Sequence, residues 1–105
     1  MRNPIYSSKA NDPDLGDAIE AFVVTLAERV DELQDAEFKD DLKGLGALAN
    51  ALGSRADQLG FGSLAASASA VEGCSHSGDI EEIREVLLDL TEIARRIRMG
   101  HRGSV

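Results

Sequence analysis

The residues with the strongest potential for chemistry are one cysteine and two histidines, Cys74, His76 and His101. Nucleophilic catalysis requires a Ser or Cys that a neighbouring base activates, and no such pair is apparent here. Cys74 and His76 have the spacing of two metal ligands, but two ligands do not make a metal site. We therefore interpret Cys74 and His76 as ordinary members of a polar loop (74–78), and we assign no metal, cofactor or catalytic residue.

A stripe of small and polar residues runs along the middle of the chain. At about 100° per residue, Lys43 and Asp57 point only about 20° away from the direction of Asn50 on a helix. The stripe comprises Lys39, Lys43, Gly46, Asn50, Ser54 and Asp57. Such a stripe is either a solvated face or a docking surface that another backbone or an anion can approach closely.

Charge limits the choice of partner. The 105 residues include 11 Lys and Arg against 19 Asp and Glu, for a formal net charge of −8. We expect no nucleic-acid or membrane partner, because duplex DNA and anionic lipid both require clustered cations. The last twelve residues, 94–105, depart from this balance because they contain four arginines and no acid. We interpret these arginines as cations at a helix C-terminus, or alternatively as a docking patch for an acidic partner.

The remaining composition predicts a single domain over residues 1–105. Apolar residues make up 43% of the chain, which is enough for one packed core. No apolar run approaches the roughly 20 residues of a membrane span, and residues 1–11 lack the apolar core of a signal peptide. One cysteine excludes an intramolecular disulfide. We therefore expect a cytoplasmic protein.

Apolar residues recur at steps of three and four, which predicts four helices near residues 13–35, 37–59, 62–73 and 79–99. Asp12 followed by Pro13 predicts the first N-terminus, and Asp79 with Glu82 resembles a capping box. Gly73 and Gly100 are expected to end the third and fourth helices. We expect residues 1–11 to form an extended lead-in and residues 100–105 to form a tail.

These elements predict an all-α fold, an up-down antiparallel four-helix bundle. No segment alternates with period two, so no strand is expected. Three glycines, Gly44, Gly46 and Gly53, fall inside the second helix. Each costs about 1 kcal/mol relative to Ala in a helix interior. Their presence indicates that a neighbouring helix or a partner comes close.

Several stretches of the chain resemble bacterial histidine-containing phosphotransfer (HPt) domains. The opening residues 3–8, the stretch 12–15 and the pair Phe22-Val23 resemble the start of such domains. Residues 48–52 followed by Leu59-Gly60-Phe61 resemble their middle. The resemblance implies a four-helix bundle, which in that family presents a histidine that receives and donates a phosphoryl group.

The family's active motif, Ala-His-x-Leu-Lys-Gly, is not intact in this chain. In the register set by residues 22–23 and 60–61, Asn50 takes the histidine position, Gly53 the lysine position and Ser54 the glycine position. A rival register built on residues 42–44 places Asp40 at the histidine position and requires an insertion in the bundle. Neither register supplies a histidine.

The resemblance therefore implies an HPt-like module that binds a response-regulator receiver domain or a histidine kinase without relaying phosphate. An amide nitrogen is not a useful nucleophile, because its lone pair is delocalised into the carbonyl. The expected receiver-binding residues are Lys39, Lys43, Gly46, Asn50, Gly53, Ser54 and Asp57. One alternative is that Asn50, helped by Lys43, orients a water that dephosphorylates the receiver. Another is a helical adaptor or homodimer that uses the Gly/Ala-rich faces of the second and third helices.

Overall fold

The computed structural model describes residues 3–102, with side chains up to Gly100, and this part of the chain is all-α. Four helices follow one another: α1 (Gly16–Phe38), α2 (Leu42–Gln58), α3 (Gly62–Ser77) and α4 (Ile80–Arg102). No strand occurs among residues 3–102. The predicted four-helix architecture is confirmed.

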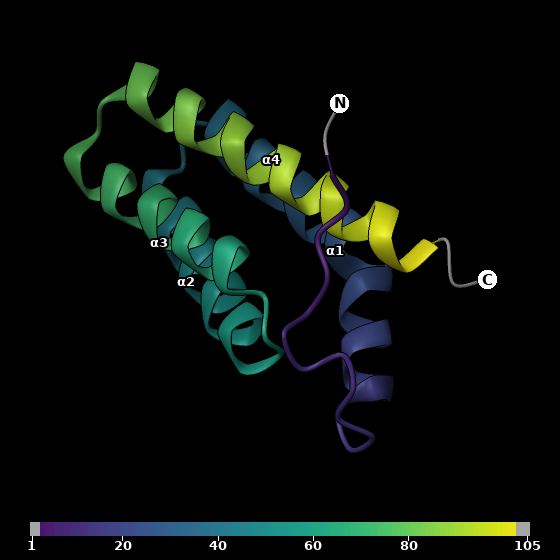
Figure 1. Ribbon diagram of the computed structural model, residues 1–105. Coiled ribbons are helices and arrows are strands. Elements are labelled where there is room, and N and C mark those ends of the chain that lie inside the picture. The colour runs from purple at the N-terminus through teal and green to yellow at the C-terminus, as the bar shows by residue number, and fades with distance from the viewer. Residues whose placement is uncertain (1–2, 103–105) are drawn as a thin grey trace.

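The helices form a closed ring of neighbours in which α1 contacts α2, α2 contacts α3, α3 contacts α4, and α4 returns to α1 (Figure 1). Successive helices run in opposite directions. Glu37 near the end of α1 pairs with Arg84 near the start of α4, and Gln34 one turn earlier meets Thr91 further along α4. This arrangement is the up-down antiparallel bundle that short connections favour.

The core is aliphatic and lies along the bundle axis. In α1 the buried residues are those that the three-and-four spacing predicts, together with Ala36. They are Ile19, Phe22, Leu26, Val30, Leu33 and Ala36. Aromatic stacking contributes to this core, because the rings of Phe22 and Phe61 stack with their centroids 5.7 Å apart. Burying each Leu or Phe side chain contributes about 1.5–3 kcal/mol.

The N-terminal segment 3–15 is extended along part of its length and lies against the bundle (Figure 1). The amide of Ile5 donates to the carbonyl of Arg96 in α4 at 3.0 Å, and the amide of Ser8 donates to the carbonyl of Gly60 at 2.9 Å. The buried Ser7 hydroxyl donates to the carbonyl of Leu59. This strap, residues 3–9, therefore links α4 to the corner between α2 and α3.

The predicted start of the first helix is wrong by three residues. The carboxylate of Asp12 accepts from the amide of Asp14 at 2.9 Å, and the amide of Leu15 donates to the carbonyl of Asp12 at 3.1 Å. Asp12 thus closes a turn instead of capping a helix, and α1 begins only at Gly16. The side chain that we assigned to the N-cap serves the local Asx turn that Asp also favours.

The boundary between the first two helices also differs from the prediction. α1 continues to Phe38, and α2 begins at Leu42 instead of near residue 37. Asp40 between them has a positive φ of 59°, which interrupts helical geometry. The carboxylate of Asp41 accepts from the amide of Gly44 at 2.9 Å and caps α2.

The third helix extends beyond its predicted end at Gly73. α3 continues to Ser77, and Gly78 ends it in the left-handed conformation with φ 77°. Cys74 and His76 therefore belong to a helix, so the predicted loop at 74–78 is wrong. Continuation of the helix is favourable because it brings Cys74 and Ser75 into buried positions.

The start of the fourth helix is predicted correctly, and its end is not. The carboxylate of Asp79 accepts from the amide of Glu82 at 3.2 Å, as expected for the N-cap. The helix does not stop at Gly100 but continues to Arg102. Gly100 instead allows the strap to lie close, because a Cβ there would be 2.9 Å from the carbonyl oxygen of Ile5. Residues 103–105 of the expected tail lie outside the described residues.

Candidate functional site

Asn50 lies near the middle of α2 on its exposed side. Its neighbour Ala49 and the nearby Leu52 face the core and are buried. Asp40, the residue that the rival register would place at the histidine position, lies in the turn between α1 and α2. Of the two candidates, only Asn50 is an exposed residue within a helix.

The Asn50 side chain is held by a residue of α3. Its amide nitrogen Nδ2 donates to both carboxylate oxygens of Glu72, each at 3.2 Å. A carboxylate only accepts hydrogen bonds, so this contact fixes the orientation of the amide, with its nitrogen toward Glu72 and its oxygen away from it. The contact with Glu72 is not predictable from the sequence, because the helix patterns do not show which residues of α2 and α3 meet.

Gly46 and Gly53 face α3, where they permit close contact between the two helices. A Cβ at Gly46, which is buried, would lie 2.7 Å from Oγ of Ser75. A Cβ at Gly53 would lie 3.2 Å from the Cβ of Ala68. For Gly46 and Gly53 the expected close neighbour is therefore α3 of the same chain, whereas Gly44 lies in the first turn of α2, where a Cβ would meet the carboxylate of Asp41. Gly46 and Gly53 position the site and offer little surface of their own.

The other residues of the predicted stripe are exposed but do not all lie on one helix. Lys43, Ser54 and Asp57 belong to α2 and are exposed, as expected. Lys39 instead follows the last residue of α1, where its ammonium pairs with the carboxylate of Asp35 at 3.0 Å. The prediction that Lys39 continues the α2 face is wrong, because the turn at Asp40 separates it from that helix.

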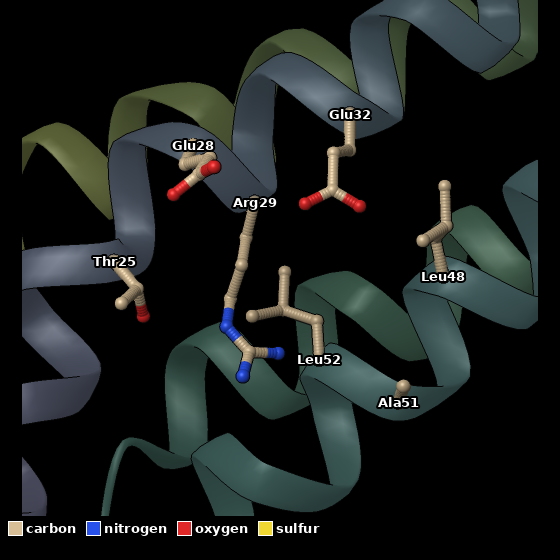
Figure 2. Close-up of a pocket in the computed structure, with 7 residues that line it drawn as sticks. All are labelled: Thr25, Glu28, Arg29, Glu32, Leu48, Ala51 and Leu52. Carbon is tan, nitrogen blue, oxygen red and sulfur yellow. The ribbon is translucent and has the colours of Figure 1, made fainter.

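An open groove of about 340 Å³ lies between α1 and α2 (Figure 2). Its α2 wall includes Leu48, Ala51 and Leu52, and Ala51 directly follows Asn50 in the sequence. Its α1 wall is polar and consists of Thr25, Glu28, Arg29 and Glu32. The groove thus combines an apolar wall with a charged wall. No pattern in the sequence predicts this groove.

Arg29 is the central charge of the groove. Its guanidinium carbon lies 5.6 Å from the centroid of the Phe22 ring, a cation–π distance. Figure 2 shows Arg29 and Glu32 extending from α1 toward α2. Arg29 is also the sole cation within the sequence of α1, and an isolated arginine in an acidic helix is the one signal that could have indicated this wall.

The cysteine and histidine do not form a reactive pair. Cys74 is buried, and its thiol donates to Oε1 of Glu82 at 3.2 Å. Burial raises the pKa of this thiol, and the neighbouring carboxylates of Glu82 and Asp79 raise it further. A thiol that is held protonated is a poor nucleophile and a poor metal ligand. Among the residues that the structure describes, no group of three or more His, Cys, Asp and Glu could hold a metal ion.

The basic residues near the C-terminus are partly engaged within the chain. The guanidinium of Arg95 pairs with Glu92 at 2.8 Å, and that of Arg96 donates to the carbonyl of Asn3 at 2.7 Å. Arg98 is exposed. The side chain of Arg102 lies outside the described residues. Of these arginines, Arg96 therefore helps to attach the strap to α4.

The fold and the site together define this protein as a small four-helix bundle with a polar, largely exposed α2 face. None of the helices between residues 3 and 102 is long and apolar enough to cross a bilayer. Comparison with family models, curated proteins and solved structures finds no significant match.

Proposed function

We propose that this chain is an HPt-like docking module that binds a response-regulator receiver domain, or a histidine kinase, in the cytoplasm without relaying phosphate. One observation carries the proposal: Asn50 is exposed near the middle of a helix, at the position where the resemblance places the family's histidine. An amide at that position offers no lone pair for phosphoryl transfer. The chain keeps an accessible face but lacks the reactive nitrogen.

The environment of Gly53 supports the loss of transfer. The resemblance assigns a lysine to this position, where a cation would lie near the transferred phosphate. A side chain at Gly53 would press on Ala68, since their Cβ atoms would be only 3.2 Å apart. Lys43 lies seven residues before Asn50, or about 10 Å along the helix, which is too far for a direct contact. The α2–α3 packing is thus adapted to the absence of the lysine.

The proposed docking surface extends from the Asn50 face of α2 into the groove beside α1. Lys43, Ser54 and Asp57 supply its polar part, and Leu48 and Ala51 supply the apolar wall of the groove. A partner helix that lies along α2 would cover both, as in helix-in-groove recognition. Gly46 and Gly53 contribute by holding α2 close to α3, and Lys39 flanks the surface from the end of α1.

Binding of a receiver domain can be tested separately from phosphate transfer. Purified receiver domains from the source organism are mixed with the chain, and affinity is measured by calorimetry. Ala51→Glu places a charge on the docking surface and is expected to weaken binding at least tenfold. Ala70→Glu makes the same exchange at an exposed position of α3 and serves as the matched control. Equal affinities for the two variants would contradict the proposed surface.

The two alternative functions predict different outcomes when the chain is mixed with a receiver domain, phosphorylated for the first alternative and free for the second. A shortened lifetime of the receiver's phosphate would support amide-assisted dephosphorylation in place of simple docking. A homodimer in light scattering, with no receiver binding, would support the adaptor. The adaptor was suggested by the Gly/Ala-rich faces of α2 and α3, but Gly46 and Gly53 are already in contact with the chain's own α3.

A further inference from the structure

Glu72 is the only acidic residue of α3, and it lies against the one side chain on which the proposed function depends. Both of its carboxylate oxygens are 3.2 Å from the amide nitrogen of Asn50. The exposed residues that flank Asn50 along α2 are small and neutral, namely Ala47, Ala51 and Ser54. The charged group in direct contact with Asn50 is therefore a carboxylate.

A negative charge at this point opposes the approach of phosphate. Like charges a few ångströms apart repel by an amount that is substantial near a protein surface and weakens with added salt. The cations of the α2 face do not compensate fully, because Lys43 lies about 10 Å from Asn50 along the helix. A phosphoryl group that reached Asn50 would thus meet a carboxylate before it met a cation.

We propose that Glu72 makes the surface around Asn50 reject phosphoryl groups, so that the module prefers the unphosphorylated form of its receiver. The rejection of anions rests on the geometry alone, and the preference for one form of the receiver rests on the proposed function. Glu72 is then a second barrier to phosphotransfer, independent of the missing imidazole. Restoring a histidine at position 50 would not by itself restore efficient phosphorylation.

The first experiment uses a small phosphodonor and needs no partner protein. Asn50→His is introduced together with His76→Gln and His101→Gln, so that a single imidazole remains, and the protein is incubated with phosphoramidate. An imidazole nitrogen forms a bond to phosphorus while the P–N bond of phosphoramidate breaks, and ammonia leaves with the electron pair of that bond. The rate of phosphohistidine formation is followed by ³¹P NMR with and without Glu72→Gln.

We expect Glu72→Gln to accelerate phosphorylation roughly five- to tenfold at low ionic strength, with a smaller effect in 0.5 M salt. Asp57→Asn removes the same charge seven residues, or about 10 Å along the helix, from position 50, and it is expected to change the rate less than twofold because the repulsion falls with distance. The neutral reagent diethyl pyrocarbonate, applied at pH 8.5, should modify the imidazole equally fast with and without Glu72→Gln. Equal phosphorylation rates with and without Glu72→Gln, including no reaction in either, would overturn the proposal.

The second experiment measures the affinity of the unaltered chain for a receiver in its free and phosphorylated forms. We expect at least a fivefold preference for the free form, and Glu72→Gln should reduce it. Equal affinity for both forms would overturn the proposed preference. If neither form binds, the docking function fails, whereas the phosphoramidate rates still decide whether Glu72 rejects phosphate.

Discussion

Gly46 and Gly53 determine how closely α2 approaches α3, because each occupies a position where a side chain would meet the other helix. The neighbour of Gly46 is the hydroxyl of Ser75, which also donates to the carbonyl of Glu72 at 2.6 Å. A larger residue at 46 would have to displace that hydroxyl and break its hydrogen bond. The same close approach brings Glu72 within reach of Asn50.

Gly46→Ala is expected to destabilise the fold by about 1–2 kcal/mol, since overpacking outweighs the higher helix propensity of Ala. Urea unfolding measures the change. In a Ser75→Ala background the clash is removed, because the next atom of residue 75 is 3.7 Å away. There Gly46→Ala should become neutral or stabilising. A destabilisation of the same size in both backgrounds would show that Ser75 is not the cause.

Gly73→Ala is the matched control for this exchange. Gly73 is exposed within α3, and a Cβ there would meet nothing within 4 Å. The substitution should therefore stabilise the protein by about 0.5–1 kcal/mol, the propensity difference alone. The opposite signs at positions 46 and 73 distinguish a packing glycine from one that merely occurs in a helix.

The Cys74 thiol is expected to make the free energy of unfolding depend on pH in the alkaline range. Burial and Glu82 raise the pKa of its thiol in the folded state, so the folded protein retains this proton to higher pH than the unfolded chain does. The stabilisation is complete below the ordinary thiol pKa of about 8.5 and is lost as pH rises through the folded value. Cys74→Ala is expected to cost about 1 kcal/mol at pH 7 and less at pH 10. A cost that is constant across this range in urea unfolding would contradict the assignment.

For single residues, the helical period correctly predicts exposure at four positions of α2: Lys43, Asn50, Ser54 and Asp57. It did not predict Glu72, because contacts between helices depend on their relative rotation and shift. Those quantities are set by the small residues at the α2–α3 contact, which a pattern within one helix does not reveal.

The corners between α2 and α3 and between α3 and α4 each depend on a glycine with positive φ. Gly60 and Gly78 have similar values, 83° and 77°, and so carry a similar backbone cost for any other residue. Only Gly60 also contacts the strap, since a Cβ there would lie 2.7–2.9 Å from Ser7, Ser8 and Lys9 atoms. Comparing substitutions at the two glycines therefore distinguishes the cost of a positive φ from the cost of displacing the strap.

Gly78→Ala is expected to cost about 1–2 kcal/mol, the penalty of a left-handed Ala. Gly60→Ala should cost about 3 kcal/mol, because displacement of the strap adds to the same penalty. It should also speed hydrogen exchange of the Ser8 amide, which donates to the carbonyl of Gly60. Similar costs at the two sites, with unchanged exchange at Ser8, would show that the strap adds nothing to the bundle.

The sequence predicts a helix start correctly where the capping aspartate has no other local hydrogen bond to make. Asp79 caps α4 as expected, whereas Asp12 forms a turn with Asp14. Asp41 caps α2, although the apolar pattern suggested a helix that had already begun. The apolar periodicity continues through this boundary because the end of α1 and the start of α2 contribute to the same core. Only Asp40 and Asp41 therefore indicate where one helix ends and the next begins.

The whole molecule has far more acidic than basic groups. Its formal net charge is −8, and ion pairs such as Lys39–Asp35 and Arg84–Glu37 each include an exposed partner. Exposed pairs of this kind contribute little to stability, so like-charge repulsion is expected to dominate. The fold class was predictable from four amphipathic repeats and short connections. The groove was not, because it depends on the looser spacing of α1 and α2 and on where Arg29 points.

Sodium chloride should therefore stabilise the protein. Raising its concentration from 0.02 to 0.5 M shortens the Debye length and screens the repulsion, with an expected gain of about 1 kcal/mol. The free energy of unfolding from urea titrations at each salt concentration measures the effect. A loss of stability with salt would mean that the ion pairs outweigh the repulsion.

The most direct test of the proposed function is to mix the chain with a receiver domain, once free and once carrying labelled phosphate on its aspartate, and to follow both the complex and the label. We predict a complex that Ala51→Glu weakens, together with no label on this chain and an unchanged lifetime of the receiver's phosphate. Label transferred to the chain, or the absence of a complex with any receiver from the source organism, would contradict the account.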